Sequence, residues 1–289
     1  MIVVVGDASW DVHYEVPRLP SLGETLSGRL IYQGPAGGSA NTAAWSASLG
    51  SEVMLAAQLA TDVAGGRFQI ACDAIAQLHL HVLPGATHTR LTTVLMTPDT
   101  ERTIVIDAPW KSNNVAPDEA VLTQLREAAV ALINVDDRDT RTLYNTESNA
   151  ITVLPMQFLA DELESNSSWD VIVGSTAENE PPDSHDLLRV GAKLCVLTTG
   201  EAGGRFWLYG HWATYESLPV AARRDSTGAG DAFVGGLMVG LERGLAAEGA
   251  LAVASWTGAR AVEQMGSWPQ SDLAPPQYLL SPSSCVGND

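Results

Sequence analysis

Short apolar runs that are bounded by turn residues follow one another along most of this chain, and they indicate strands. They occupy residues 2–7, 52–60, 89–97, 102–107, 129–136, 150–155, 170–175 and 193–200. Stretches of helical pattern fit between several of them, for example at residues 39–49, 118–129 and 156–166. Strands that alternate with helices and are apolar on both faces are typical of parallel sheets. We therefore expect an α/β fold in which helices cover a mainly parallel central sheet.

One section departs from this alternation. Residues 23–34, GETLSGRLIYQG, read as a strand excursion without helices, which indicates a small β lid over the main sheet. We expect lid strands from about residues 12–36 and 88–107. The chain shows no internal repeat and no clear linker, so we expect one domain over residues 1–289. The tail from residue 269 is rich in proline and serine and is expected to be loop.

The formal net charge of −18 restricts the partners of the chain, because nucleic acid and an anionic membrane would both be repelled. Only two lysines accompany fourteen arginines, so helix N-termini, backbone N–H groups and arginines would have to hold a phosphate ligand. No apolar run is long enough to cross a bilayer, and the first residues do not form a signal peptide. Three widely spaced cysteines fit neither a disulfide framework nor a metal cluster, which favours the cytoplasm.

The stretch RRDSTGAGDAFVGGLMVGLERG, residues 223–244, crowds glycines around one carboxylate, Asp231, before an apolar, helix-like segment. Glycine is unfavourable at an ordinary helix start, so we interpret this turn as a helix N-terminus whose uncovered amides hold an anion. Asp231 would then take a proton from an attacking hydroxyl while the amides stabilise phosphoryl charge. The alternative is a tight strand–helix turn in which Asp231 only stabilises the helix dipole. Neither GxxxxGK[ST] nor GxGxxG occurs in this stretch.

Two motifs carry a resemblance to a known family. Residues 225–238, DSTGAGDAFVGGLM, resemble position by position the carboxy-terminal motif of the ribokinase-like (PfkB) carbohydrate kinases. Residues 37–50, GGSANTAAWSASLG, resemble the amino-terminal motif of that family, and the order of elements matches to about residue 266. The resemblance implies a Rossmann-like sheet with a small β lid. It also implies that the chain transfers the γ-phosphoryl group of ATP to a hydroxyl of a sugar or sugar-like molecule, uses Mg²⁺, and forms a homodimer through the lid.

The resemblance also assigns roles to individual residues. Asp231 falls at the catalytic base of the family. The positions of the anion hole are occupied by Gly228, Ala229 and Gly230. The positions that contact the substrate are occupied by Asp11, Gly37, Gly38 and Asn41. A carboxylate such as Asp11 can accept two hydrogen bonds from a diol. The alternative is that Asp11 is an acidic loop residue after a strand, with no role in binding. Asn41 has helix capping as its alternative.

A further match to the family predicts where the nucleotide binds. Residues 197–204, LTTGEAGG, resemble the Thr-x-Gly-x-x-Gly of the family at a strand end, which puts Thr198 and Gly200 near the nucleotide. Thr227 and Gly228 are expected to bind it as well. Small residues in the stretch 255–266 would line the adenine pocket.

Two carboxylates match cation positions of the family. Glu178 falls at the glutamate of the family that organises Mg²⁺ through water. Glu180 is a second candidate for this position. The alternative is that Glu178 is only an acidic residue at a helix start. Asp225, together with Thr227, occupies a position that helps to bind a monovalent cation such as K⁺ in relatives.

Three positions depart from the family pattern. Ser175 stands where asparagine is usual, Ala60 stands where glycine is usual, and Ser39 follows the glycine pair where many relatives carry lysine. The missing lysine disfavours a phosphorylated substrate, although Arg102 is within reach from the lid. The other two departures leave open a non-catalytic or regulatory sugar- or nucleotide-binding homologue. A nucleoside kinase of the same fold is a further alternative, whereas an oxidoreductase is disfavoured because no glycine fingerprint follows the first strand.

Overall fold

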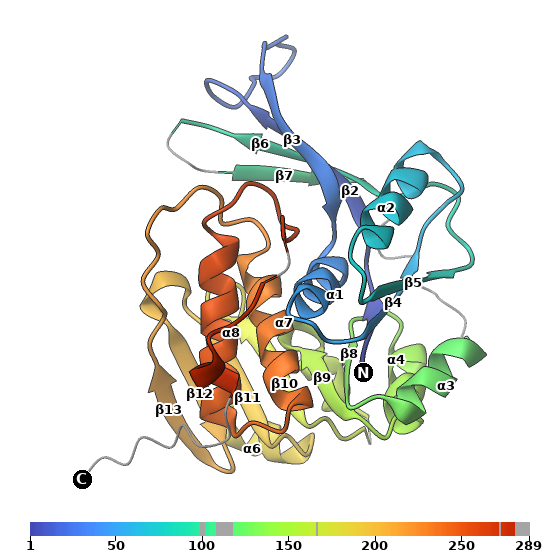
Figure 1. Cartoon of the computed structure of the whole chain (residues 1–289), viewed down its shortest axis with the longest axis vertical. Coiled ribbons are helices and arrows are strands. Elements are labelled where there is room, and N and C mark those ends of the chain that lie inside the picture. The colour runs from blue at the N-terminus through green and yellow to red at the C-terminus, as the bar shows by residue number, and fades with distance from the viewer. Residues whose placement is uncertain (99–101, 108–117, 166, 272, 281–289) are drawn as a thin grey trace.

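The computed structural model describes residues 1–98, 102–107, 118–165, 167–271 and 273–280. Two sheets make up its frame (Figure 1). A large sheet has helices on both faces, and a smaller sheet projects from the end of the molecule at which strand β1 finishes.

The large sheet has nine strands within the described residues, in the order β13-β12-β11-β10-β9-β8-β1-β4-β5. The strands are β1 (Ile2–Gly6), β4 (Val53–Gln58), β5 (Leu78–Leu83), β8 (Val130–Ile133), β9 (Ile151–Pro155), β10 (Val171–Ser175), β11 (Leu194–Thr198), β12 (Gly204–Leu208) and β13 (His211–Tyr215). Neighbours pair in parallel from β5 to β11, and only the β11–β12 and β12–β13 pairs are antiparallel. The expected mainly parallel sheet is therefore confirmed.

Helices cover both faces of this sheet because its central strands are apolar on both sides. Alternate residues of β1 enter two separate cores: Ile2 and Val4 join one, and Val3 and Val5 join the other. The first core includes side chains of α1 (Gly38–Ser48), α2 (Val63–Asp73), α7 (Ala229–Glu242) and α8 (Ala247–Ala261). The second includes side chains of α3 (Glu119–Glu127), α4 (Arg138–Thr146), α5 (Leu159–Glu162) and α6 (Ser184–Arg189). No helix in these described ranges has the length and hydropathy that a bilayer crossing requires.

Short 3₁₀ turns complete the chain: η1 (Met156–Phe158), η2 (Gly200–Ala202) and η3 (Gln277–Leu280). The last of these turns lies in the tail that the sequence predicts to be loop, so the loop prediction is wrong for that segment. The helix predicted at residues 156–166 is divided between η1 and the short helix α5.

The small sheet is the lid, with the strand order β3-β2-β6-β7. Its strands are β2 (Ser9–Glu15), β3 (Arg29–Ala36), β6 (Leu91–Met96) and β7 (Arg102–Ile106). Strand β2 pairs with β3 in antiparallel and with β6 in parallel fashion, and β7 pairs antiparallel with β6. Because β2 begins at Ser9, ahead of the expected boundary at residue 12, Asp11 lies on a lid strand. Residues 99–101 of the second expected lid segment lie outside the described residues.

Helix α7 packs closely between α1 and α8 because it presents glycines to both. A Cβ at Gly235 would lie 2.9 Å from the carbonyl oxygen of Thr42 in α1. A Cβ at Gly236 would lie 2.9 Å from the Cα of Ala254 in α8, and one at Gly240 would lie 2.6 Å from the Cα of Ala250. These three glycines of the motif therefore serve helix packing, and this packing fixes the start of α7 beside the start of α1.

Candidate active site

The first turns of α7 and α1 meet at Asp231 and Asn41. The Nδ2 of Asn41 donates a hydrogen bond of 2.7 Å to Oδ2 of Asp231. The neighbouring hydroxyl of Thr42 donates to the backbone oxygens of Asp231 (3.2 Å) and Gly38 (3.0 Å). The two motifs that lie far apart in the sequence thus form one polar junction below the lid.

Asp231 is half-buried, and its environment suits a base that works near neutral pH. Burial raises the pKa of this carboxyl to about 7, and the negative charges of Asp7 and Glu178 act in the same direction. The hydrogen bond from Asn41 and the positive charge of Arg102 oppose the rise in pKa. Desolvation has the largest effect on the pKa, as expected for a carboxylate that folding removes from water. A carboxylate whose pKa is near 7 is basic enough to serve as a general base at neutral pH.

The glycines at the start of α7 have different surroundings. Gly228 caps the helix in the left-handed conformation (φ 73°), and a Cβ there would lie 2.7 Å from the Cβ of Ser267. Gly230 is exposed, and apart from its chain neighbours and the backbone of its own helix no described atom lies within 4 Å of the position that its Cβ would take. The open backbone of the turn therefore lies at Gly230, beside Ala229 and Asp231. An uncovered helix N-terminus of this kind favours an anion.

The substrate carboxylate predicted at Asp11 lies on the inner face of β2. Its side chain is buried, and Oδ1 accepts a hydrogen bond of 2.9 Å from the Ser9 hydroxyl. The ring of His13 follows on the same face, with Nε2 3.8 Å from Oδ2 of Asp11. Tyr32 of β3 packs edge-on against His13 with ring centroids 4.9 Å apart. Burial, with the charges of Asp11 and Asp225, raises the pKa of Tyr32 to about 12, so its hydroxyl stays protonated.

A second carboxylate, Asp7, lies directly after β1 and was not among the predicted site residues. It accepts hydrogen bonds from the amides of Gly38 and Ser39 (2.9 Å each) and from the Ser39 hydroxyl (2.8 Å), and it forms an ion pair of 2.6 Å with Arg90. Burial alone would raise its pKa, but Arg90 and Ser39 hold the pKa below its ordinary value. Asp7 therefore stays ionised, caps α1, and adds negative charge beside Asp231. Its place at the carboxyl end of the first strand was the available signal.

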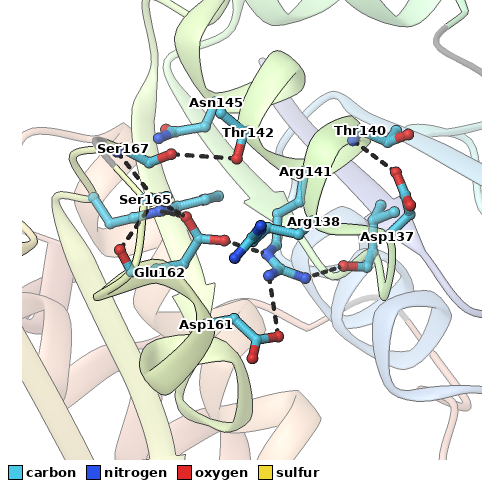
Figure 2. Close-up of polar contacts among 12 residues, drawn as sticks. Asp137, Arg138, Thr140, Arg141, Thr142, Asn145, Asp161, Glu162, Ser165 and Ser167 are labelled. Carbon is cyan, nitrogen blue, oxygen red and sulfur yellow. Dashed lines mark hydrogen bonds and ion pairs between the residues drawn. The ribbon is translucent and has the colours of Figure 1, made fainter.

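A buried ion pair supports the loop after β8, which also reaches this site. Asn134 in that loop donates to Oδ1 of Asp7 (3.2 Å) and to the Ser39 hydroxyl (2.9 Å). Arg141 of α4 and Glu162 of α5 are both fully buried. The Nε of Arg141 forms an ion pair with Oε1 of Glu162 at 2.7 Å (Figure 2). The guanidinium also donates to the carbonyl oxygens of residues 135 (2.7 Å) and 136 (3.2 Å). The ion pair thus holds the backbone next to Asn134.

The expected nucleotide residues lie at the ends of β11 and at the start of α7. The hydroxyl of Thr198 donates to the carbonyl oxygen of Gly174 (3.4 Å), and Gly200 opens the next turn in the left-handed conformation (φ 60°). At the start of α7, Arg102 of the lid strand β7 donates a hydrogen bond to the Thr227 hydroxyl (3.2 Å). The lid therefore contributes a positive charge at the helix start that carries Gly230.

The two candidate cation residues have unequal surroundings. Asp225 is buried, and its carboxylate accepts hydrogen bonds from the amides of Thr227 (2.9 Å) and Gly266 (3.0 Å). Glu178 is exposed in the turn after β10, and its charge reaches Asp231. The Ser175 hydroxyl, which replaces the usual asparagine, accepts a bond of 3.2 Å from the Ala177 amide in this turn.

No cluster of three His, Cys, Asp or Glu side chains that could cage a metal occurs in the described part of the chain. A single carboxylate such as Glu178 fits the way Mg²⁺ is held beside phosphates, because that ion keeps several waters. The other departure, Ala60, lies in the turn before α2, where its amide donates to the Thr89 hydroxyl (3.1 Å).

Comparisons with known proteins find similarity to pfkB family and ribokinase-like kinases. The family model described as pfkB family carbohydrate kinase matches residues 169–272. A ribokinase from Arabidopsis thaliana is 24% identical over 93% of this chain and 77% of its own length. The nucleoside kinase structure from Methanocaldococcus jannaschii superposes with a TM-score of 0.76 at 15% identity and covers 96% of both chains. The structure of the Arabidopsis thaliana ribokinase with ribose and ATP has a TM-score of 0.73 at 21% identity, and covers 96% of this chain and 98% of its own.

The family model covers the carboxy-terminal part of the candidate site. The family model includes Asp231 and the whole start of α7, and the ribokinase fold of the neighbours accounts for the large parallel sheet and the lid. The chain therefore has the ribokinase fold of its structural neighbours, and its residues 169–272 match the family model described as pfkB family carbohydrate kinase.

Proposed function

We propose that the protein transfers the γ-phosphoryl group of ATP to a hydroxyl of a sugar or sugar-like small molecule, with Asp231 as general base. One observation carries the proposal. A half-buried carboxylate, whose pKa is raised to about 7, lies in the first turn of a helix whose backbone is open at Gly230. A base and an anion site that are adjacent in one turn are the two elements that phosphoryl transfer to an alcohol needs.

In the proposed reaction, Asp11 and Asn41 bind hydroxyls of the acceptor and leave one of them facing Asp231. The carboxylate takes the proton of that hydroxyl as its oxygen forms a bond to the γ-phosphorus. The bond from that phosphorus to the bridging oxygen of ADP then breaks. The amides of residues 228–230 stabilise the charge on the transferred group, and Arg102 adds positive charge from the lid.

The nucleotide is proposed to lie along Thr198, Gly200, Thr227 and Gly228. Bound Mg²⁺ would neutralise charge on the phosphates, with Glu178 as its contact through water. K⁺ is proposed near Asp225, where a buried carboxylate lies beside the turn that holds the anion site.

The charges of the site favour an uncharged acceptor. The Ser39 side chain, at the position where many relatives carry lysine, is bonded to Asp7 and Asn134. Arg90 is paired with Asp7, so its charge is compensated. A second phosphate group on the acceptor would therefore meet little positive charge in a chain whose formal net charge is −18.

The test is ADP formation from ATP with a panel of pentoses, hexoses and nucleosides. We expect ADP release with at least one unphosphorylated sugar or sugar-like polyol, and loss of that release in Asp231→Asn with ATP binding retained. A nucleoside as the preferred acceptor would instead favour the second candidate, which the fold likeness to the Methanocaldococcus jannaschii nucleoside kinase supports. Saturable binding without ADP across the panel would refute catalysis and favour a regulatory homologue.

We also propose a cytoplasmic homodimer that forms through the lid. The lid exposes apolar side chains that a partner would cover: Leu30, Leu91, Ile104, Val105 and Ile106, each between 43% and 57% exposed. Both cysteines within the described residues, Cys72 and Cys195, are buried free thiols, which fits a reducing compartment.

A further inference from the structure

The carboxylate of Asp231 is held through one of its two oxygens. The Nδ2 of Asn41 donates to Oδ2 at 2.7 Å, which is in the short range of a hydrogen bond to a charged group. Asn41 is only 5% exposed, so water does not compete strongly for this bond. We propose that Asn41 is a positioning residue that fixes Oδ2 of the base, so that Oδ1 is the oxygen that takes the substrate proton. This inference rests on the proposed function.

The surroundings of Oδ1 support this assignment. A Cβ at Gly38 would lie 3.3 Å from Oδ1 of Asp231 and 3.8 Å from the nearer oxygen of Asp7. Gly38 has no Cβ, so its side of Oδ1 is left uncovered. Its amide is bonded to Asp7, which keeps this backbone in place. The two oxygens of Asp231 therefore differ: one is held by an amide group, and the other faces a glycine.

Asn41 keeps an acceptor for the substrate while its amide nitrogen holds the base. Its Oδ1 is buried and has no hydrogen-bond partner among the residues that the structure describes. A buried acceptor without a partner costs free energy, and a hydroxyl donor of the substrate would satisfy it. The side chain is thus suited to two tasks at once. It orients the base through Nδ2 and can accept a hydrogen bond from a second hydroxyl next to the reacting one.

The bond to Oδ2 favours the ionised form of Asp231, and this effect can be measured. The other charged groups that act on Asp231 are Asp7 after β1, Glu178 after β10 and Arg102 of β7. They remain in place when Asn41 is changed. Without the donated bond, burial and the two like charges act with less opposition. The carboxyl group then keeps its proton to higher pH.

The experiment compares Asn41→Ala and Asn41→Asp with the wild-type protein, and Ser46→Ala is the matched control. Ser46 is buried one turn later in α1, and its hydroxyl contacts the backbone oxygens of Thr42 and Gly235. The ¹³C resonance of the Asp231 carboxyl, assigned with Asp231→Asn, is titrated without substrates. We expect Asn41→Ala to move the midpoint upward by about one pH unit, a tenfold change in proton affinity. Asn41→Asp should move it further, because it adds a like charge, and Ser46→Ala should not move it.

The acid limb of kcat measured against pH should move in the same direction in Asn41→Ala. A residue that only bound the sugar would raise KM and leave both midpoints in place, and that result would overturn the inference. Thermal unfolding of each variant shows that it is folded before it is titrated. If the wild-type protein formed no ADP but the carboxyl midpoint still moved, the proposed function would fail and the positioning role would stand.

Discussion

Asp231 shows how a single residue acquires its chemistry from its neighbours. An aspartate in water would be almost fully ionised at pH 7 and a weak base. In this fold, desolvation outweighs the hydrogen bond from Asn41, and the pKa rises to about 7. The motif alone predicted this residue as the base, whereas its pKa depends on burial and on Asp7 and Glu178, which are remote in the sequence.

The first prediction concerns the rate as a function of pH. Because Asp231 must be deprotonated to act, kcat/KM for the sugar should fall as the pH drops through about 7 and level off above it. Steady-state rates between pH 5.5 and 9, with saturating ATP, measure this limb. A rate that stays constant down to about pH 5 would contradict the assignment, because an unperturbed aspartate titrates near 4.

The second prediction concerns stability. The folded protein binds the Asp231 proton more tightly than the unfolded chain does, since the pKa rises from 3.8 to about 7 on folding. The stability that this proton provides is present at low pH and is lost as the pH rises from about 4 to about 7. Asp231→Asn should therefore be inactive, yet unfold at a higher temperature than wild type at pH 8.

Each kcal/mol that Asp231→Asn relieves should raise Tm by about 2–4 °C. Calorimetry at pH 4 and pH 8 gives the comparison, with the two proteins expected to converge at the lower pH. An equal difference at both pH values would mean that titration of Asp231 is not its cause.

At the scale of elements, the packing of helix α7 explains why its motif is so rich in glycine. Gly235, Gly236 and Gly240 let α1 and α8 approach its backbone. Gly228 adopts a left-handed conformation as the N-cap, and Gly230 leaves the first turn uncovered. The sequence predicted an anion site at residues 228–230 and gave the later glycines no separate role, whereas in the structure those later glycines serve helix packing.

A matched pair of variants tests this division. Gly240→Ala places a methyl group 2.6 Å from the Ala250 Cα, and we expect a loss of about 1–3 kcal/mol in unfolding free energy with kcat retained. Gly230→Ala has room for the methyl group and gains helix propensity, so stability should be unchanged or higher by up to about 1 kcal/mol. Its methyl group would occupy the approach of the phosphate and weaken ATP turnover at least tenfold. Full turnover in Gly230→Ala would place the anion elsewhere.

The ion pair between α4 and α5 gives a prediction at the same scale. Arg141 and Glu162 are both fully buried, so removing the negative partner leaves an uncompensated charge (Figure 2). Glu162→Gln should cost about 3–5 kcal/mol of unfolding free energy. Asp161→Asn is the control, because that carboxylate is 59% exposed and 3.5 Å from the same guanidinium, and it should change stability by less than about 1 kcal/mol. Denaturant unfolding measures both, and equal losses would mean that burial is not what matters.

The strands were predictable because buried parallel strands are continuous apolar runs, and residues 2–7, 170–175 and 193–200 each contain one. Local motifs predicted Asp231 and Asn41 as site residues, and the fold brings these two side chains together. Asp7 was not, because its role depends on Arg90 and Asn134, which approach it only in the fold. The extent of β2 was missed for a similar reason, since its first residues are ordered by pairing with β3 and β6.

At the scale of the whole molecule, the exposed lid strand β7 predicts how two chains associate. Ile104 and Val105 are 47% and 57% exposed on adjacent, opposite-facing positions. We expect the wild-type protein to be a dimer by light scattering, and Ile104→Glu or Val105→Glu to yield monomers with an unchanged Tm for the core. Leu188→Glu is the control, because Leu188 is 62% exposed on α6, outside the lid, and should leave the dimer intact. A monomeric wild-type protein would refute the lid interface.

The lid is assembled from two separate pieces of the chain. The hairpin of β2 and β3 precedes α1 in the sequence, whereas β6 and β7 follow β4, α2 and β5. In the proposed reaction, the first piece carries Asp11, which binds the acceptor, and the second carries Arg102, which adds positive charge at the phosphate. Exchange of either piece with a relative would alter one of these contacts and spare the other. Acceptor preference and phosphate handling in this scaffold can therefore diverge independently during evolution.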